Sequence, residues 1–274
     1  MSTQVTPDTA DGWTVLHQMF SVDWSALQTL NRDQVQELTS SFCEILSPWL
    51  NKSDHGQSAL FHVLGHKADL MLLHFRSSFE LCGEIELALA RSGLGRFLTQ
   101  ATSYLSVVEL GMYRATVQLH EELTAEGLEP DSKEWKEQYQ LKLSKFKESF
   151  QPRCYTEIPE HRYMCFYPMS KKRLGQDNWY TLPVEKRAEL MLEHGMTGRH
   201  YTDRVKQIIS GSIGYDDWEW GVDLFAHDHL DLKSLVYKMR FDEGSSRYGE
   251  FGPFYLGLRL SPEKMVEFLR GAKS

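Results

Sequence analysis

The stretch RYMCFYPMSKKR (Arg162–Arg173) carries the pattern from which the fold of this chain can be worked out. Its first half alternates, so a strand here places Tyr163, Cys165 and Tyr167 on one face and the intervening apolar residues on the other. Pro168 follows at once, and because proline cannot donate to a sheet, the pattern predicts that the strand ends there. The stretch therefore predicts a two-faced strand that ends on a tyrosine hydroxyl.

The residues that follow this strand alternate between helical and strand patterns. Helix ends are predicted from capping residues: Asn31 is the predicted N-cap of a helix in the first half of the chain, and glycines indicate where helices end. After the first strand, the pattern predicts a helix over 184–195 closed by Gly195, a helical stretch over 199–209, a strand over 216–226, a helix over 230–239 and a strand over 253–260. In the first half, it predicts a strand over 13–20, a helix over 31–49, two strands within 58–75, a helix over 78–91 and a strand over 102–110.

Both halves thus have roughly the order strand, helix, strand, helix, strand, with one extra strand in the first half. This order indicates an α+β fold of duplicated ferredoxin-like halves, with antiparallel sheets paired into a barrel and helices outside. We expect an N-terminal half over residues 1–120, a charged linker over 121–152 and a C-terminal half over 153–274. Charged residues dominate 121–149, which is typical of a solvated linker helix.

Composition excludes several classes of protein. The chain has 274 residues, 41% hydrophobic and 25% charged, in the range of globular proteins. Its net charge of −8 argues against nucleic acid as a partner, because phosphate binding needs a basic face. We expect no signal peptide, since the N-terminus lacks a basic and an apolar region, and no membrane span. Cys82 and Cys165 lie in apolar segments without zinc-site spacing, so we expect buried thiols in a reduced, cytoplasmic protein.

His194 is the histidine whose position is most suggestive. It precedes Gly195 at the expected end of a helix, so its imidazole can project past the helix end into a cavity as a metal ligand. Position alone equally fits a histidine favoured at a helix C-terminus by the dipole. His62, His66 and His74 have no acidic or sulfur ligands at metal-site spacing, and we expect them to be packed or at the surface.

Several cations fall near predicted element ends in the second half: Arg153, Lys171, Arg199 and Arg240. Arginine binds carboxylates through two parallel hydrogen bonds, and lysine adds a point charge, so these side chains suit a small anionic ligand. The same residues also fit ordinary surface charges. No dinucleotide or phosphate-binding glycine motif and no nucleophile elbow is present, which excludes the commonest cofactor and nucleophile classes.

Four ordered segments carry a resemblance to a known family: RYMCFYPMSKKR, NWYTLPVEKRAELMLEHGMTGRHY, QIISGSIGYDDWEWGVDLFAHD and VYKMRFDEGSSRYGEFGPFYLG. Together they resemble the haem-synthase branch of the chlorite dismutase family, the coproheme decarboxylases of Gram-positive bacteria. The resemblance is dense from Arg153 to Gly257 and follows the same layout in the first half.

This resemblance implies two ferredoxin-like halves per subunit, a homopentamer and an iron porphyrin in the C-terminal half. It implies an oxidoreductase that uses hydrogen peroxide to convert two propionates of iron coproporphyrin III (coproheme) to vinyl groups, releasing carbon dioxide and giving haem b. The porphyrin is then both substrate and redox centre. A transient contact with the coproporphyrin ferrochelatase that supplies it is a further expectation.

The resemblance also assigns roles to individual residues. His194 in LMLEHG matches the axial ligand to iron, and Tyr167 matches the tyrosine that becomes a radical beside a reactive propionate. Gln207 matches the position above the iron on the other side of the ring. The expected substrate-binding set is Arg153, Tyr167, Pro168, Met169, Ser170, Lys171, Gln207, Arg240 and Ser245.

Two points separate this chain from other members of the family. Chlorite dismutases place an arginine where this chain has Gln207, so we expect little or no chlorite activity. Gly244 and Ser246 stand where valine and alanine are usual, which leaves open whether Ser245 or Ser246 contacts a propionate. A haem-binding or haem-delivery protein without turnover is the alternative function, and the phenol of Tyr167 beside Lys171 favours the enzyme.

Overall fold

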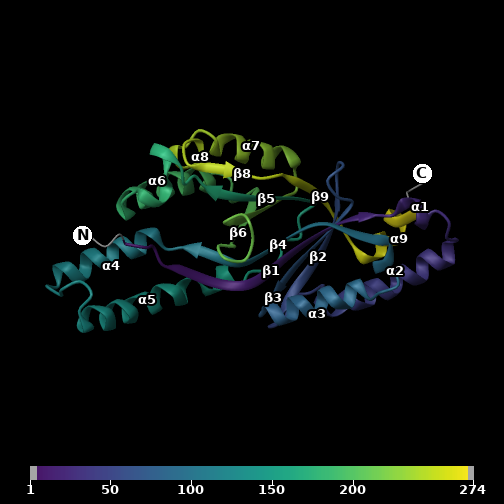
Figure 1. Ribbon diagram of the computed structural model, residues 1–274, viewed down its shortest axis with the longest axis horizontal. Helices are drawn as coiled ribbons and strands as arrows, with labels where there is room; N and C mark the ends of the chain where they lie inside the picture. Colours follow the sequence, from purple (N-terminus) through teal and green to yellow (C-terminus); the bar gives the residue numbers. More distant parts are fainter. Residues whose placement is uncertain (1–4, 271–274) are drawn as a thin grey trace.

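The computed structural model describes residues 5–270, so the first four residues of the N-terminal segment discussed above lie outside the described part. A nine-stranded antiparallel sheet forms its centre, in the order β7-β6-β4-β1-β3-β2-β9-β5-β8, and a further β7–β5 pairing closes the sheet into a barrel (Figure 1). The strands are β1 (Thr9–Val22), β2 (Gly56–Val63), β3 (Leu70–Arg76), β4 (Leu98–Gly111), β5 (Tyr163–Lys171), β6 (Val205–Gly211), β7 (Trp220–Ala226), β8 (Gly249–Phe251) and β9 (Tyr255–Leu260).

The duplication is visible in the strand order. The first half supplies β4-β1-β3-β2, and the second supplies β9-β5-β7-β6, which is the same 4-1-3-2 order of four strands in each half. The halves join where β4 pairs with β6 and where β2 pairs with β9. The predicted fold of duplicated ferredoxin-like halves, with antiparallel strands forming a barrel, is therefore confirmed.

Helices cover the outside of this barrel, as predicted (Figure 1). A capping box at Asn31 begins α2, which confirms the N-cap read from the sequence. The helices are α1 (Trp24–Leu27), α2 (Arg32–Leu46), α3 (Phe79–Ala90), α4 (Tyr113–Ala125), α5 (Lys133–Cys154), α6 (Val184–Arg199), α7 (His229–Met239), α8 (Glu243–Ser246) and α9 (Pro262–Arg270), with short 3₁₀ turns at Ser47–Trp49, Gly95–Phe97, Gly175–Asp177 and Trp179–Thr181.

Strand β5 shows how well the opening stretch predicts its own structure. Its two faces separate as expected, since Tyr163, Cys165 and Tyr167 pack with the apolar residues under α7, while Phe166 lies in the barrel interior. The expectation that Pro168 ends the strand is wrong, because β5 continues to Lys171. The carbonyl of Pro168 accepts a hydrogen bond from the backbone N–H of Gly252, so its backbone faces the edge of β5 that carries β9 and β8. Along this edge, β5 pairs with β9 up to position 166 and with β8 only from position 169. The missing N–H therefore falls in a gap of the ladder and removes no strand-to-strand bond.

The structure of the segment after β5 differs from the prediction in two places. Gly195 does not close a helix, since α6 runs on to Arg199 with His200 as its C-cap. No helix spans 199–209; instead β6 begins at Val205. This strand gives the second half the fourth strand that the sequence pattern predicted only for the first half. Ile208 and Ile209 favour a strand, and β6 pairs with β7 along its whole length and with β4 at its C-terminal end. Long-range pairing thus outweighs the local helical pattern.

The charged segment forms more than one solvated helix. It contains the end of α4 and most of α5, two helices that pack on each other and on the sheet. Trp135 and Leu143 lie buried on the inner face of α5 while its lysines and glutamates point to solvent. The high charge of the sequence therefore reflects the outer face alone.

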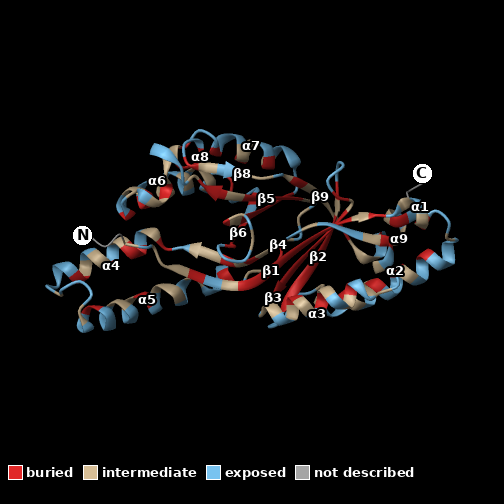
Figure 2. Cartoon of the chain, viewed as in Figure 1, coloured by how far each residue is buried: buried red, intermediate tan, exposed pale blue. Residues whose placement is uncertain are grey.

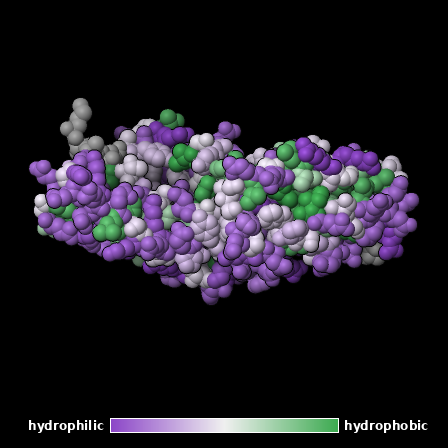
Figure 3. Space-filling view, turned by 90° about the horizontal axis from the view of Figure 1, so that it is seen from below, coloured by the Kyte–Doolittle hydropathy of each residue, from purple (hydrophilic) through white to green (hydrophobic). Residues whose placement is uncertain are grey.

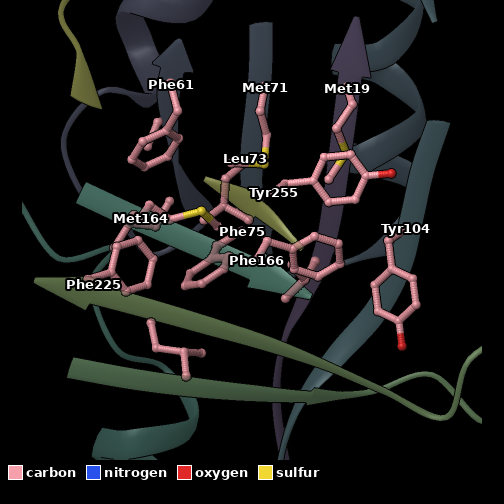
Figure 4. Close-up of a cluster of buried hydrophobic side chains, with 14 of the residues drawn as sticks. Met19, Phe61, Met71, Leu73, Phe75, Tyr104, Met164, Phe166, Phe225 and Tyr255 are labelled. Atoms are coloured by element: carbon pink, nitrogen blue, oxygen red, sulfur yellow. The ribbon is translucent and has the colours of Figure 1, made fainter. Parts of the chain in front are cut away.

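Two large apolar layers hold the structure together, besides the smaller clusters under α7 and around α4 and α5. The first fills the barrel, where aromatic and methionine side chains from both halves interdigitate, among them Phe61, Met71, Phe166 and Phe225 (Figure 4). The second lies between the sheet and α2, α3 and α9. Burial is concentrated in the central strands, whereas the outer faces of the helices are exposed (Figure 2).

Hydrophilic residues cover most of the surface seen from below (Figure 3). Between residues 5 and 270, no helix combines the length and the apolar character that crossing a bilayer requires.

Candidate functional site

A cavity of about 910 Å³ opens between the outer face of the second-half sheet and helices α6 and α7, and it extends to the start of α4 and the end of α5. Figure 1 shows α6, α7 and α8 together on one side of the barrel, well away from α2 and α3. The volume is near the upper end of the range of about 300–1,000 Å³ that is typical of sites for small molecules and cofactors. The cavity can therefore hold a large ligand.

The sheet forms the floor of this cavity through the outward side chains of its strands. On β5, Tyr167, Met169 and Lys171 line it, which is the two-residue period of a strand. Pro168 and Ser170 are not among its lining residues: they point to the other face, where Ser170 accepts a hydrogen bond from the backbone of Glu219. Of the predicted run 167–171, the structure thus brings three side chains to the cavity.

His194 lines the opposite side, from within α6 rather than at its end. Its Nδ1 lies 3.0 Å from Oδ2 of Asp242 and 3.2 Å from Oγ of Ser245, and the Ser245 hydroxyl donates to the same carboxylate oxygen at 3.1 Å. The side chain of Asp242 is 3% exposed and that of His194 26%. Burial would raise the pKa of Asp242, but the hydrogen bonds from His194 and Ser245 outweigh it and hold this pKa below its usual value.

This arrangement leaves one nitrogen of His194 available. With Nδ1–H donated to Asp242, the neutral ring carries its lone pair on Nε2, for which the described residues supply no hydrogen-bond partner. A histidine whose other ring nitrogen is held by a carboxylate is the usual form of a metal-ligating histidine. The described residues contain no group of three or more His, Cys, Asp or Glu side chains placed to hold a metal ion. A metal held by one histidine of the chain takes its remaining ligands from elsewhere, as a porphyrin iron does.

Tyr167 is the buried phenol of the cavity floor. Its ring stacks on Phe254 at 4.3 Å between centroids, and the residue is 5% exposed. Its hydroxyl makes no hydrogen bond to any residue between 5 and 270, although the side chain lines the cavity. Burial raises the pKa of Tyr167, so the phenol stays protonated near neutral pH.

Lys171 lies two residues further along the same strand face. Its Nζ donates to the carbonyl of Gly244 at 2.7 Å and lies 4.4 Å from the ring centroid of Trp179. Burial lowers the pKa of Lys171 to about 8, against the opposing attraction of Asp242 and Glu219. The ammonium is therefore charged at neutral pH and close to losing its proton.

The remaining predicted residues border the cavity on separate elements. Arg153 comes from the end of α5 and Arg240 follows α7, and both are exposed cations whose guanidinium groups lie over Phe150 and Phe251 without an acidic partner among the described residues. Gln207 lines the cavity from β6. Ser245 lines it from α8, whereas Ser246 bonds to the backbone of Asp242 and does not.

Two residues at the site were missed by the sequence. Asp242 caps α8 and fixes His194, and Glu109 reaches the cavity from the end of β4 in the first half. The pattern Asp242-x-x-Ser245 is a helix N-cap signal that could have been found. Glu109 has no local signal, because it lies 111 positions from Trp220, the residue that binds it.

The fold and the site together define a closed barrel of two ferredoxin-like halves that carries a cavity of about 910 Å³ with one carboxylate-held histidine. Residues 33–260 match the sequence profile of the chlorite dismutase family, which covers most of the chain. The protein belongs to the chlorite dismutase family.

Solved structures agree with this assignment. One, described as a novel haem-binding protein from Thermus thermophilus, is 39% identical, and the match covers 98% of this chain and 100% of that one with a TM-score of 0.83. A mutant chlorite dismutase from Candidatus Nitrospira defluvii is 19% identical over 94% of this chain and 96% of its own, with a TM-score of 0.71. The imidazole complex of the enzyme from the same organism gives 20% identity, the same coverage and a TM-score of 0.71. At such identity these two structures support the fold alone.

Proposed function

We propose that the protein is a coproheme decarboxylase, which uses hydrogen peroxide to convert two propionates of iron coproporphyrin III to vinyl groups and so forms haem b. The observation that carries this proposal is Tyr167, a buried phenol with an unpaired hydroxyl in the same cavity as His194. A protein that only stores or delivers a porphyrin has no use for a phenol held ready beside the ligand.

The charges of the cavity suit a porphyrin that carries four carboxylates. Arg153, Arg240 and Lys171 line it from three different elements, so they can hold propionates at separate corners of the ring. Such fixation would present one chosen propionate to Tyr167. His194 would bind the iron through Nε2, and the porphyrin iron, when bound, supplies the redox chemistry with peroxide.

The reaction makes clear demands on these residues. Each propionate loses two electrons, one proton from its β-carbon and carbon dioxide, while one hydrogen peroxide takes up two electrons and two protons to become two waters. Tyr167 would pass a hydrogen atom between the propionate and the oxidant, a role that requires a protonated phenol. Its raised pKa and its buried, stacked ring support this role.

Substitution of Tyr167 by phenylalanine tests the proposal. The variant keeps the stacked ring, so we expect it to bind iron coproporphyrin III as the wild type does but to yield no vinyl product when peroxide is titrated in and products are followed by mass. Tyr163→Phe is the matched control, because Tyr163 lies on the same strand face but does not line the cavity. Full turnover by Tyr167→Phe would remove the tyrosine from the mechanism.

The same assay separates the other functions. Binding of iron coproporphyrin III without loss of carbon dioxide in the wild type would indicate a haem-binding or haem-delivery protein. Release of dioxygen from chlorite would indicate chlorite dismutase activity, which the neutral side chain of Gln207 disfavours. The proposal also includes assembly as a homopentamer, a cytoplasmic location and a transient contact with the coproporphyrin ferrochelatase.

A further inference from the structure

Cations line the cavity on several sides, but among the described residues only one carboxylate lines it, that of Glu109. Glu109 is half-buried near the end of β4, on the outward face that continues the cavity floor. Its Oε1 accepts a hydrogen bond from the indole Nε1 of Trp220 at 3.2 Å, and Trp220 also lines the cavity. An ionised carboxylate in this cavity would repel a ligand that carries several negative charges, so the presence of Glu109 suggests a specific role for its carboxyl group.

The neighbouring strand makes room for this carboxyl group. Gly211 on β6 lies beside it, and a Cβ at that position would collide with Oε2 of Glu109. Because residue 211 has no side chain, the carboxyl group can lie against β6 at this position, where it also accepts the hydrogen bond from the indole of Trp220. Since Oε1 is occupied by the indole N–H, Oε2 is the oxygen that can carry a proton.

A second carboxylate lies beside Glu109 on the neighbouring strand. Asp11 on β1 is its cross-strand partner in the β1–β4 register, and Asp11 is exposed to solvent. Burial and the like charge of Asp11 raise the pKa of Glu109, against the opposing hydrogen bond from Trp220. The phenol of Tyr113 on α4 also interacts electrostatically with Glu109, while β6 and β7 contribute Gly211 and Trp220.

We propose that Glu109 is the group through which the cavity takes up protons from solvent, with Asp11 as its outer partner. This inference rests on the proposed function. At neutral pH, the conversion of one propionate and one peroxide to a vinyl group, carbon dioxide and two waters consumes one proton overall. The β-carbon supplies one of the two protons that peroxide needs, and the second must come from outside the cavity.

The step can be written with the atoms balanced. The O–H bond at Oε2 of Glu109 breaks, and its proton joins an oxygen of peroxide that leaves as water. The two electrons that reduce the peroxide come from the propionate. The Glu109 carboxylate then regains a proton from solvent at the side of Asp11.

Other polar groups of the cavity are less suited to this task. The amide of Gln207 does not exchange a proton at neutral pH, and the Nδ1 proton of His194 is bound to Asp242. Lys171, whose pKa is lowered to about 8, can also release a proton, but it is buried and its ammonium donates to the carbonyl of Gly244, whereas Glu109 has the solvent-exposed Asp11 as its cross-strand partner. Arginines stay protonated and cannot act as the donor.

Substitution of Glu109 by glutamine tests the inference. The variant keeps the shape of the side chain and an oxygen that accepts from Trp220, but it removes the ionisable proton. We expect decarboxylation with peroxide to slow by about 10²-fold, the size of a general-acid contribution. Binding of iron coproporphyrin III should be unchanged, because the variant replaces a protonated, uncharged carboxyl group by an uncharged amide of the same shape. Glu86→Gln is the matched control: Glu86 is also half-buried and accepts a side-chain N–H, from Gln18, but lies outside the cavity.

Two further measurements distinguish proton uptake from a structural role. Glu109→Ala should regain activity when formate is added, because a small acid can occupy the space left by the carboxyl group. A purely structural role would give no such rescue. In the protein without porphyrin, an infrared band of a protonated carboxyl group should persist at a pH above the ordinary glutamate value of about 4.3. The band should be absent in Glu109→Gln and should shift to lower pH in Asp11→Asn.

The outcomes separate this inference from the proposed function. If the wild type makes no vinyl product, the proposed function fails, and the infrared titration still tests Glu109 by itself. If the wild type is active and Glu109→Gln turns over at the wild-type rate, Glu109 is not the proton donor. Absence of a carboxyl band above the ordinary range would overturn the inference whatever the activity.

Discussion

Replacing Asp242 by asparagine should weaken His194 as an iron ligand while leaving the fold intact. Asparagine caps helices as well as aspartate does, so Oδ1 can keep the bond of 2.9 Å from the backbone of Ser245 that begins α8. The other carboxylate oxygen becomes an NH₂ group, which donates and cannot accept from Nδ1 of His194. The imidazole proton then moves to Nε2, where it blocks the lone pair that would bind iron.

The size of the effect follows from these contacts. Loss of the carboxylate behind a ligating histidine costs about 10–100-fold in metal affinity. The variant also loses two hydrogen bonds to a charged group, from His194 and from the Ser245 hydroxyl, each of about 1.5–3 kcal/mol. Since the new NH₂ group can donate to Nδ1, a bond worth about 0.5–1.5 kcal/mol is recovered, and we expect a loss of about 2–5 kcal/mol in the free energy of unfolding.

Absorbance titration with iron coproporphyrin III measures the affinity, and urea unfolding measures the stability. Asp228→Asn is the matched control, because Asp228 also caps a helix, α7, but does not contact His194. The pKa of Asp242 is lowered by folding, so its contribution is present above about pH 3.9, the ordinary aspartate value, and is lost on further acidification. Wild-type affinity for the iron porphyrin in Asp242→Asn would refute the proposed role of the His194–Asp242 pair.

Two further predictions concern charge and packing. Folding lowers the pKa of Lys171 to about 8, so its charged form destabilises the folded state below that pH, and this cost disappears as the pH rises toward about 10.4. The free energy of unfolding of the wild type should therefore rise between about pH 8 and pH 10.4 by an amount that Lys171→Met lacks, which urea unfolding at pH 7 and at higher pH measures. The same pH dependence in both proteins would contradict the burial of a charged amine. Phe61→Ala empties a fully buried position in the barrel and should cost about 3–5 kcal/mol by the same measurement. Leu87→Ala, on an exposed face of α3, should change stability by less than about 0.5 kcal/mol, and equal losses would contradict the assigned core.

Local patterns predicted a large part of this structure. The alternation in β5 assigned its two faces correctly, since side-chain direction in a strand depends only on its two-residue period. The cap at Asn31 fixed the start of α2, because its side chain accepts from the backbone three residues on. The order of such elements indicated the ferredoxin-like halves. The resemblance in the second half pointed to His194, Tyr167 and Lys171, which the structure brings to one cavity.

The sequence by itself therefore determined the class of fold, the two faces of β5 and several of the second-half residues that meet at the cavity, among them His194, Tyr167 and Lys171. Tertiary structure alone decided that 205–211 is a strand, that β5 continues past Pro168, and that Asp242 and Glu109 join the site. The physical reason is the separation of the partners along the chain. A cap or a strand face involves residues a few positions apart, whereas the pairing of β4 with β6 and the bond from Trp220 to Glu109 form only when the barrel closes.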